Sequence, residues 1–92
     1  MTTTPPPPAG ATWVDVDWQD GNRFFTGAEV EVGALSGRLT VGIAGSQHRS
    51  GRTLTNVRVC GDPPDLTPAQ ARQFARALMA AADRAEVVDG IA

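Results

Sequence analysis

A polar stretch from Gly45 to Arg52 holds the one histidine of this 92-residue chain, His48, together with Arg49. Guanidinium groups bind phosphate through paired hydrogen bonds, and the serines and glycines around them add further donors. The stretch could therefore hold a phosphate or an RNA backbone. It has no lysine and lacks the glycine spacing of a Walker motif, so it predicts no nucleotide site. The alternative interpretation, a mobile and solvated hairpin loop, is the one we favour.

A second group of charged side chains falls on one face of the expected sheet. Carboxylates gathered in this way could bind a metal ion or act as acid and base. However, no histidine lies among them, and a flat sheet supplies no cleft to tune them. We therefore expect a solvated face whose opposite charges pair across strands, and no catalytic, metal-binding or cofactor-binding residue. The residues of this outer face are Asp15, Asp17, Glu29, Glu31, Arg38 and Arg58.

Trp13 shares the outer face with these charges. An exposed tryptophan is a good anchor for a protein interface, because it offers a large apolar area and a polar edge. The alternative is that the N-terminal tail folds over Trp13, and both interpretations stay open. Arg72 and Arg76 lie one helical turn apart in the C-terminal segment and could form a basic stripe, but no aromatic residues lie between them to stack on bases.

The alternation of apolar residues predicts the strands that carry these side chains. The first strand is predicted over Thr12–Gln19, with Val14, Val16 and Trp18 facing the core. The last is predicted over Thr53–Cys60. There Val57 and Val59 face inward and Arg58 outward, while Leu54 is out of phase and indicates a bulge.

The best-determined prediction is a hairpin with a tight turn at Ser36-Gly37. Counting outward from that turn places Ala34 opposite Leu39, Val32 opposite Val41, and Val30 opposite Ile43, all on one face. A shift of one residue would send these side chains to the other face. Phe24 shares the parity of Val30 and is expected in the core, and Gly27 indicates a bend or bulge between them.

The segment Asp65–Glu86 predicts a helix with a complete start signal. Thr67 is a fitting N-cap, Pro68 occupies the first helical position, and Gln70 completes a capping box. An apolar stripe follows at helical spacing, formed by Ala71, Phe74, Ala75, Leu78, Met79 and Ala82. After Glu86 we expect a short tail docked on the sheet edge.

The predicted fold class is α+β: a four-stranded antiparallel meander followed by one C-terminal helix packed on one face (ββββα). We expect a single domain over residues 12–92 and a disordered, proline-rich tail over residues 1–11. The four consecutive prolines of that tail favour a polyproline conformation, so the tail could also be a ligand for a proline-binding groove.

The composition limits the possible partners. A formal charge of −2 and an isoelectric point near 5.1 argue against bulk attraction to nucleic acid or to an anionic membrane. No apolar run approaches the roughly 20 residues of a membrane-spanning helix, and the N-terminus lacks the basic start and apolar run of a signal peptide. A cytoplasmic location is expected. The single cysteine, Cys60, rules out an internal disulfide framework.

The C-terminal segment "LTPAQARQFARALMAAAD" resembles the C-terminal helix of many small uncharacterised actinobacterial and actinophage proteins. The residues that match are Leu66, Thr67, Pro68, Ala69, Ala71, Leu78, Ala80, Ala81 and Ala82, over about a fifth of the chain. The resemblance implies a short sheet before the helix and no activity. A fainter likeness in topology, to small sheet-plus-helix stress proteins suggested to bind ribosomes, keeps a nucleic-acid function as an alternative.

The functional prediction is a small non-enzymatic protein-interaction module, a host or phage accessory protein whose partner is another protein or a second copy in a homodimer. The outer face of the sheet or a strand edge would form the contact, with Trp13 as its anchor. The alternative is an RNA- or ribosome-associated protein that uses Arg49 and Arg52 in the loop and Arg72 and Arg76 on the helix edge. No cofactor and no membrane partner are expected.

Overall fold

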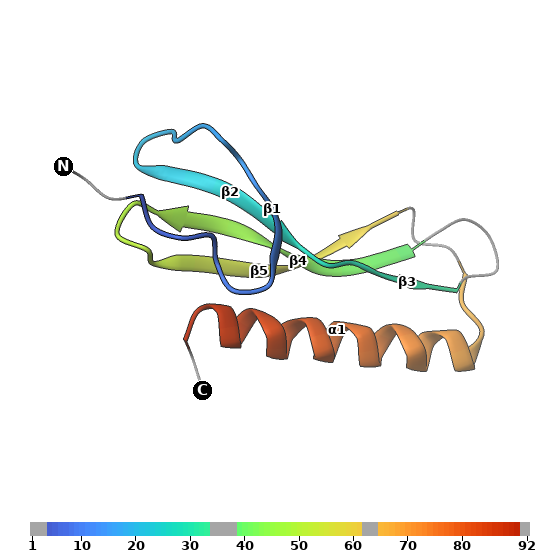
Figure 1. Ribbon diagram of the computed structural model, residues 1–92. Coiled ribbons are helices and arrows are strands. Elements are labelled where there is room, and N and C mark those ends of the chain that lie inside the picture. Colours follow the sequence, from blue (N-terminus) through green and yellow to red (C-terminus); the bar gives the residue numbers. More distant parts are fainter. Residues whose placement is uncertain (1–3, 34–38, 62–64, 91–92) are drawn as a thin grey trace.

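The chain folds into two layers, an antiparallel β-sheet and one α-helix, in a computed structural model that describes residues 4–33, 39–61 and 65–90 (Figure 1). This confirms the predicted α+β class with a C-terminal helix. The sheet has five strands, however, and not four. In chain order the elements are β1 (Ala11–Val14), β2 (Asn22–Gly27), β3 (Val30–Val32), β4 (Leu39–His48), β5 (Thr53–Cys60) and α1 (Pro68–Val88).

The fifth strand arises because the predicted second strand is broken into β2 and β3, which lie end to end along one edge of β4. Thr26 pairs with Ala44 and Val30 pairs with Val41, so one extra residue lies between the two ladders. The break follows Gly27, as the sequence indicates. A Cβ on Gly27 would overlap the side chain of Ile43, so the position needs glycine. β1 pairs with β2, and β5 takes the other edge of β4.

The hairpin between β3 and β4 has a different register from the predicted one. Val32 pairs with Leu39 and Val30 with Val41, two residues away from the predicted partners. A shift of two residues keeps each described side chain on its predicted face, so Val32, Leu39 and Val41 are buried as expected. Val30 was also expected in the core, but it is 48% exposed. The predicted turn at Ser36-Gly37, and with it Ala34 and Arg38, lies outside the described residues.

The extra residue between β2 and β3 reverses the prediction for the two phenylalanines. Phe25 is 1% exposed and faces the helix side, whereas Phe24 is 65% exposed on the outer face. Counting by twos from Val30 to Phe24 assumes one unbroken strand, and the bulge changes that parity.

The bulge predicted at Leu54 is absent from β5. β4 and β5 pair without any shift from Thr40↔Cys60 to Gln47↔Thr53, so Leu54 simply faces outward and there is no bulge there.

β1 is shorter than the predicted first strand. It ends at Val14, and Val16, which was expected in the core, is 88% exposed. Local hydrogen bonding accounts for this, because the carboxylate Oδ1 of Asp15 accepts the backbone N–H of Asp17 at 3.0 Å. Such a side-chain bond offers the backbone an alternative to the ladder. A turn follows through Asp20 and Gly21, both at positive φ.

The helix begins as predicted but presents a different stripe to the sheet. Thr67 Oγ1 accepts the Gln70 N–H at 3.1 Å, and Gln70 Oε1 accepts the Thr67 N–H at 3.0 Å, which confirms the capping box. Phe74 and Leu78 pack against the core as expected. The expected Ala71, Ala75 and Met79 are exposed instead. Their place against the sheet is taken by Ala81 and Ala85, together with the partly buried Ala77 and Val88.

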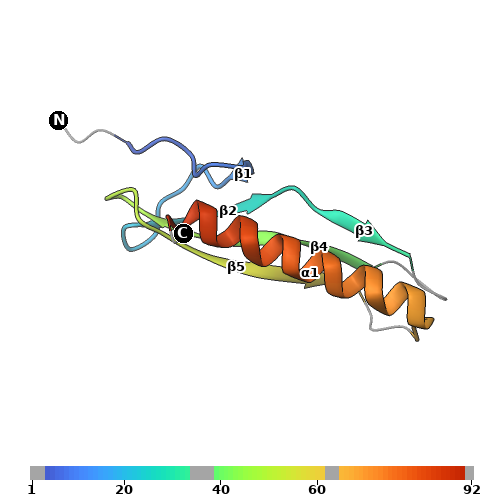
Figure 2. The ribbon, with the colours of Figure 1, turned by 90° about the horizontal axis from the view of Figure 1, so that it is seen from below.

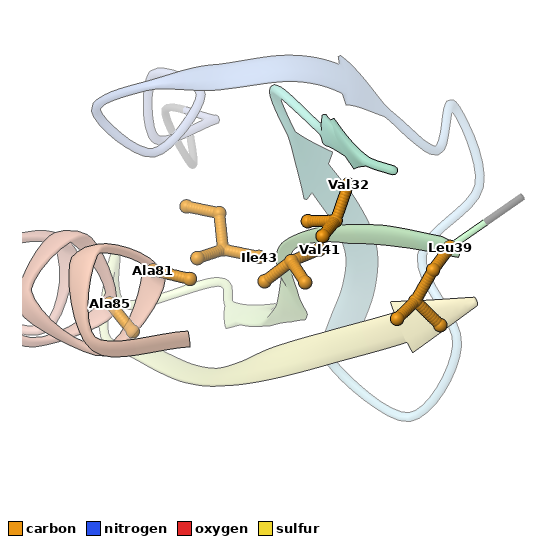
Figure 3. Packing of buried hydrophobic residues seen from close by; sticks show 6 residues of the cluster. All are labelled: Val32, Leu39, Val41, Ile43, Ala81 and Ala85. Atoms are coloured by element: carbon orange, nitrogen blue, oxygen red, sulfur yellow. The ribbon is translucent and has the colours of Figure 1, made fainter. Parts of the chain in front are cut away.

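The core therefore lies between α1 and the inner face of β3, β4 and β5 (Figures 2 and 3). Because alanine has the smallest apolar side chain, Ala81 and Ala85 let the helix approach the sheet closely. Figure 3 shows Ala81 beside Ile43, with Ala85 further along the helix. The buried cluster consists of Val32, Leu39, Val41, Ile43, Ala81 and Ala85.

The C-terminal end of α1 is fastened to β5 by one carboxylate. The helix continues to Val88, so Val87 and Val88 are helical and do not form the predicted tail after Glu86. Asp89 is the C-cap of the helix. Asp89 Oδ1 accepts the hydroxyl protons of Thr53 and Thr55, each at 2.6 Å, and Oδ2 accepts the Thr55 N–H at 3.0 Å. Burial by itself raises the pKa of Asp89, but these hydrogen bonds outweigh it and hold that pKa below its ordinary value.

Candidate functional site

The outer face of the sheet, on the side away from α1, carries three large apolar side chains. Strand pairing sets them in two neighbouring rows, with small side chains on β4 between the large ones. We call Trp13, Phe24 and Leu54 the outer apolar patch. Across β1, β2, β4 and β5, the first row contains Trp13, Thr26, Ala44 and Asn56, and the second contains Asp15, Phe24, Ser46 and Leu54.

The outer apolar patch surrounds a shallow hollow of about 460 Å³. Trp13 is 53% exposed, and Phe24 and Leu54 are each 65% exposed. The hollow exists because Ala44 and Ser46 are short and leave the middle of the face open. Single exposed apolar residues are common on proteins, but a contiguous group rimmed by polar residues is typical of an interaction surface.

Charges of opposite sign lie at the two edges of this face. On the β1 side, Asp15 and Asp17 line a second hollow of about 400 Å³ together with Asp20. On the β5 side, Arg58 lines the first hollow and Arg52 lies near Leu54. The face thus runs from an acidic edge, across the outer apolar patch, to a basic edge.

Four of the predicted site residues lie on the outer face or at its end. Trp13 and Arg58 line the same hollow, so the structure brings these two together. The predicted tail over Trp13 is not observed among the described residues, since residues 5 and 6 contact the other face of the sheet. His48 and Arg52 lie at the end of the outer face, where they line a small hollow with Leu54.

The first half of the polar stretch Gly45–Arg52 is strand, contrary to the predicted long loop. β4 continues to His48, and the connection to β5 is a tight turn in which the His48 N–H donates to the Arg52 carbonyl at 2.7 Å. The His48 Nδ1 accepts the Ser50 N–H at 3.1 Å and lies 2.9 Å from the Ser50 hydroxyl oxygen. Polar residues could extend β4 because their backbone groups pair on both sides.

The arginines of the nucleic-acid alternative do not form one surface. Arg49 lies in the β4–β5 turn, where its guanidinium carbon is 5.1 Å from the centroid of the Trp18 ring. Arg72 and Arg76 lie in the first half of α1, in the other layer and toward the opposite end of the molecule (Figure 1). An RNA backbone would have to pass around the molecule to contact both groups.

Sequence reasoning missed Phe24 and Leu54, the two partners of Trp13 in the patch. A signal for Leu54 was present, because Leu54, Asn56 and Arg58 alternate with the inward Thr55 and Val57. For Phe24 the signal was Gly27, because a bulge there changes the parity between Phe24 and Val30. Two buried polar residues on the inner face, Arg23 and Gln47, were also missed.

The comparisons with family models, with curated proteins and with solved structures gave no match. Within residues 4–33, 39–61 and 65–90, no three His, Cys, Asp or Glu side chains form a group that could hold a metal ion. In the same part of the chain, α1 is not apolar enough to cross a membrane.

Proposed function

We propose that this protein is a small non-enzymatic module that binds protein through the outer face of its sheet, and that its partner is a second copy of the same chain. The outer apolar patch carries the proposal, because three large side chains stand exposed around one hollow. Aromatic anchors next to an open pocket are the residues that contribute most to protein association. The face opposite the helix is also the one that the fold leaves uncovered.

The distribution of charge favours a second copy as the partner. A two-fold axis parallel to the strands would lay one outer face on the other and exchange their edges. Asp15 and Asp17 of each copy would then face the β5 edge of the other, which carries Arg52 and Arg58. Opposite charges at the rim set the orientation and raise the association rate, while the two apolar patches meet in the middle at the spacing of packed sheets, about 10 Å.

The outer face is large enough to form a dimer interface of standard size. An interface of standard size takes about 800 Å² from each partner, and this is about one eighth of the 6204 Å² surface of the chain. One face of a five-stranded sheet can supply it. The helix side cannot supply such a face, because α1 covers it.

Sedimentation equilibrium on the full chain tests the proposal. We expect a wild-type mass near twice 9.6 kDa, and a double variant, Trp13→Ala with Phe24→Ala, that returns toward the monomer. Met79→Ala is the matched control, since Met79 is also exposed, at 62%, but lies on the helix. A wild-type chain that stays monomeric would rule out the second copy, and a dimer unchanged by the double variant would rule out the face.

A further inference from the structure

On the inner face of the sheet, two buried polar side chains hold the proline-rich segment that precedes β1. Arg23 on β2 and Gln47 on β4 are paired across the sheet, and they are only 8% and 3% exposed. Arg23 Nη2 donates to the carbonyl oxygen of Pro5 at 3.1 Å, and Gln47 Nε2 donates to that of Pro6 at 2.9 Å. The site thus grips two consecutive carbonyl oxygens of an extended segment.

The site offers donors alone, and the segment offers acceptors alone. Arg23 Nε donates to Gln47 Oε1 at 2.9 Å, so this bond occupies the amide oxygen and leaves the amide nitrogen for the ligand. Proline has no N–H, so residues 5–8 have no backbone donors that would be buried without a partner. Pro8 is buried, so any other residue at that position would bring a backbone donor into a buried place. Pro6 and Pro7 are exposed, and they contribute the extended conformation of a polyproline segment.

The side chain of Arg23 is held in position by two neighbours, Trp18 and Gln47. The guanidinium carbon of Arg23 lies 4.6 Å from the centroid of the Trp18 ring, which restrains the long side chain in addition to its bond to Gln47. A donor that is already held loses little freedom on binding, and a polyproline segment is already extended before it binds. Aromatic residues beside donors are typical of surfaces that recognise polyproline segments.

The segment is joined to the domain by one turn. The Ala11 N–H donates to the Pro8 carbonyl at 3.1 Å, and Gly10 has a φ of +78°, the conformation that a type II turn needs at its third position. Residues 4–8 are therefore an arm connected to β1 by this turn, and rotation about the turn would lift the arm from Arg23 and Gln47.

We propose that Arg23 and Gln47 form a binding site for proline-rich segments, which the chain's own arm occupies and which a proline-rich segment of another chain can enter in its place. The ligand class follows from the donor-only chemistry. The site lies on the inner face, beyond the part of the sheet that α1 covers, and the outer apolar patch lies on the opposite face.

A peptide equivalent to residues 4–10, Thr-Pro-Pro-Pro-Pro-Ala-Gly with blocked ends, tests the proposal on the full chain by NMR titration. The signals to follow are the Arg23 Nε–H, the Gln47 side-chain amide and the Trp18 indole N–H. The tethered arm competes at an effective concentration on the order of millimolar. We therefore expect the wild type to respond only at millimolar peptide. A variant with Pro5→Gly and Pro6→Gly should respond at concentrations at least tenfold lower.

Two controls make the result decisive. A peptide with alanine at the four proline positions brings in N–H groups and should bind the same variant at least tenfold more weakly. Adding Gln47→Glu to that variant retains the contact with Arg23 but replaces the donor to Pro6 by an acceptor, and should weaken binding of the proline peptide by a similar factor. The Arg23 Nε–H and the Trp18 indole N–H report on this variant, because it has no side-chain amide at position 47. If proline and alanine peptides bind alike, or if neither shifts the three signals, the proposal is wrong.

Discussion

Replacing Asp89 by alanine should cost the protein a large part of its stability, although Asp89 lies at the end of the last helix. The substitution removes three hydrogen bonds from Thr53 and Thr55. At about 1 kcal/mol each, for a site that water still reaches, the loss in the free energy of unfolding is about 3 kcal/mol. For a chain of this size we expect the unfolding midpoint to fall by roughly 12–24 °C.

The same carboxylate predicts a dependence of stability on pH. Its pKa in the folded chain is held below the ordinary value of 3.8, since the threonine hydrogen bonds favour the ionised form. This contribution is therefore fully present above the ordinary pKa and is lost as the pH falls through the lower, folded value. The gap in stability between the wild type and Asp89→Ala should be largest near pH 7 and should shrink in acid.

Urea unfolding followed by tryptophan fluorescence at several pH values measures both effects. Asp83→Ala is the control, because Asp83 is exposed on the same helix and its loss should change the stability by no more than about 0.5 kcal/mol. The reasoning is refuted if Asp89→Ala costs less than about 1 kcal/mol, or if its difference from the wild type does not shrink in acid.

Three further predictions test the fold. Phe25→Ala should lose about 3–5 kcal/mol of the free energy of unfolding, while Phe24→Ala should lose little, because only Phe25 is buried. Thermal unfolding of the two variants measures this difference, and equal losses would contradict it. Thr67→Ala should lower stability by about 1 kcal/mol through the capping box, and a urea midpoint unchanged from the wild type would contradict it. In Gly45→Ala a Cβ would overlap the backbone of β5, so a loss of about 3 kcal/mol is expected, whereas Gly33→Ala, with its nearest neighbour 3.9 Å away, should unfold like the wild type by circular dichroism.

Part of the candidate site could be predicted from local alternation. Trp13 and Arg58 were placed correctly on the outer face because each lies in a strand whose neighbours alternate in polarity. Phe24 could not be placed, because the two ladders of β4 differ by one residue and the face of Phe24 depends on where that residue falls. Arg38 belongs to the predicted face as well, but it lies outside the described residues.

The proline-binding contacts illustrate a second limit. Gln47 was assigned to a solvated loop because no apolar residue surrounds it in the sequence. Its burial comes from Arg23, 24 positions away, and from Pro6, 41 positions away. Polar residues that satisfy one another across the fold leave no periodic signal, since their partners are distant in the chain.

The sequence by itself determined the features that depend on near neighbours. The helix start at Thr67, the inward faces of Val32, Leu39 and Val41, and the α+β class follow from hydrogen bonds and alternation within a few residues. Only the tertiary structure decided which face Phe24 takes beyond the bulge at Gly27, which side of the helix is buried through Ala81 and Ala85, and the exposure of the outer apolar patch. These features depend on contacts between side chains far apart in the sequence, such as Ile43 beside Gly27 and the sheet residues against which Ala81 and Ala85 pack.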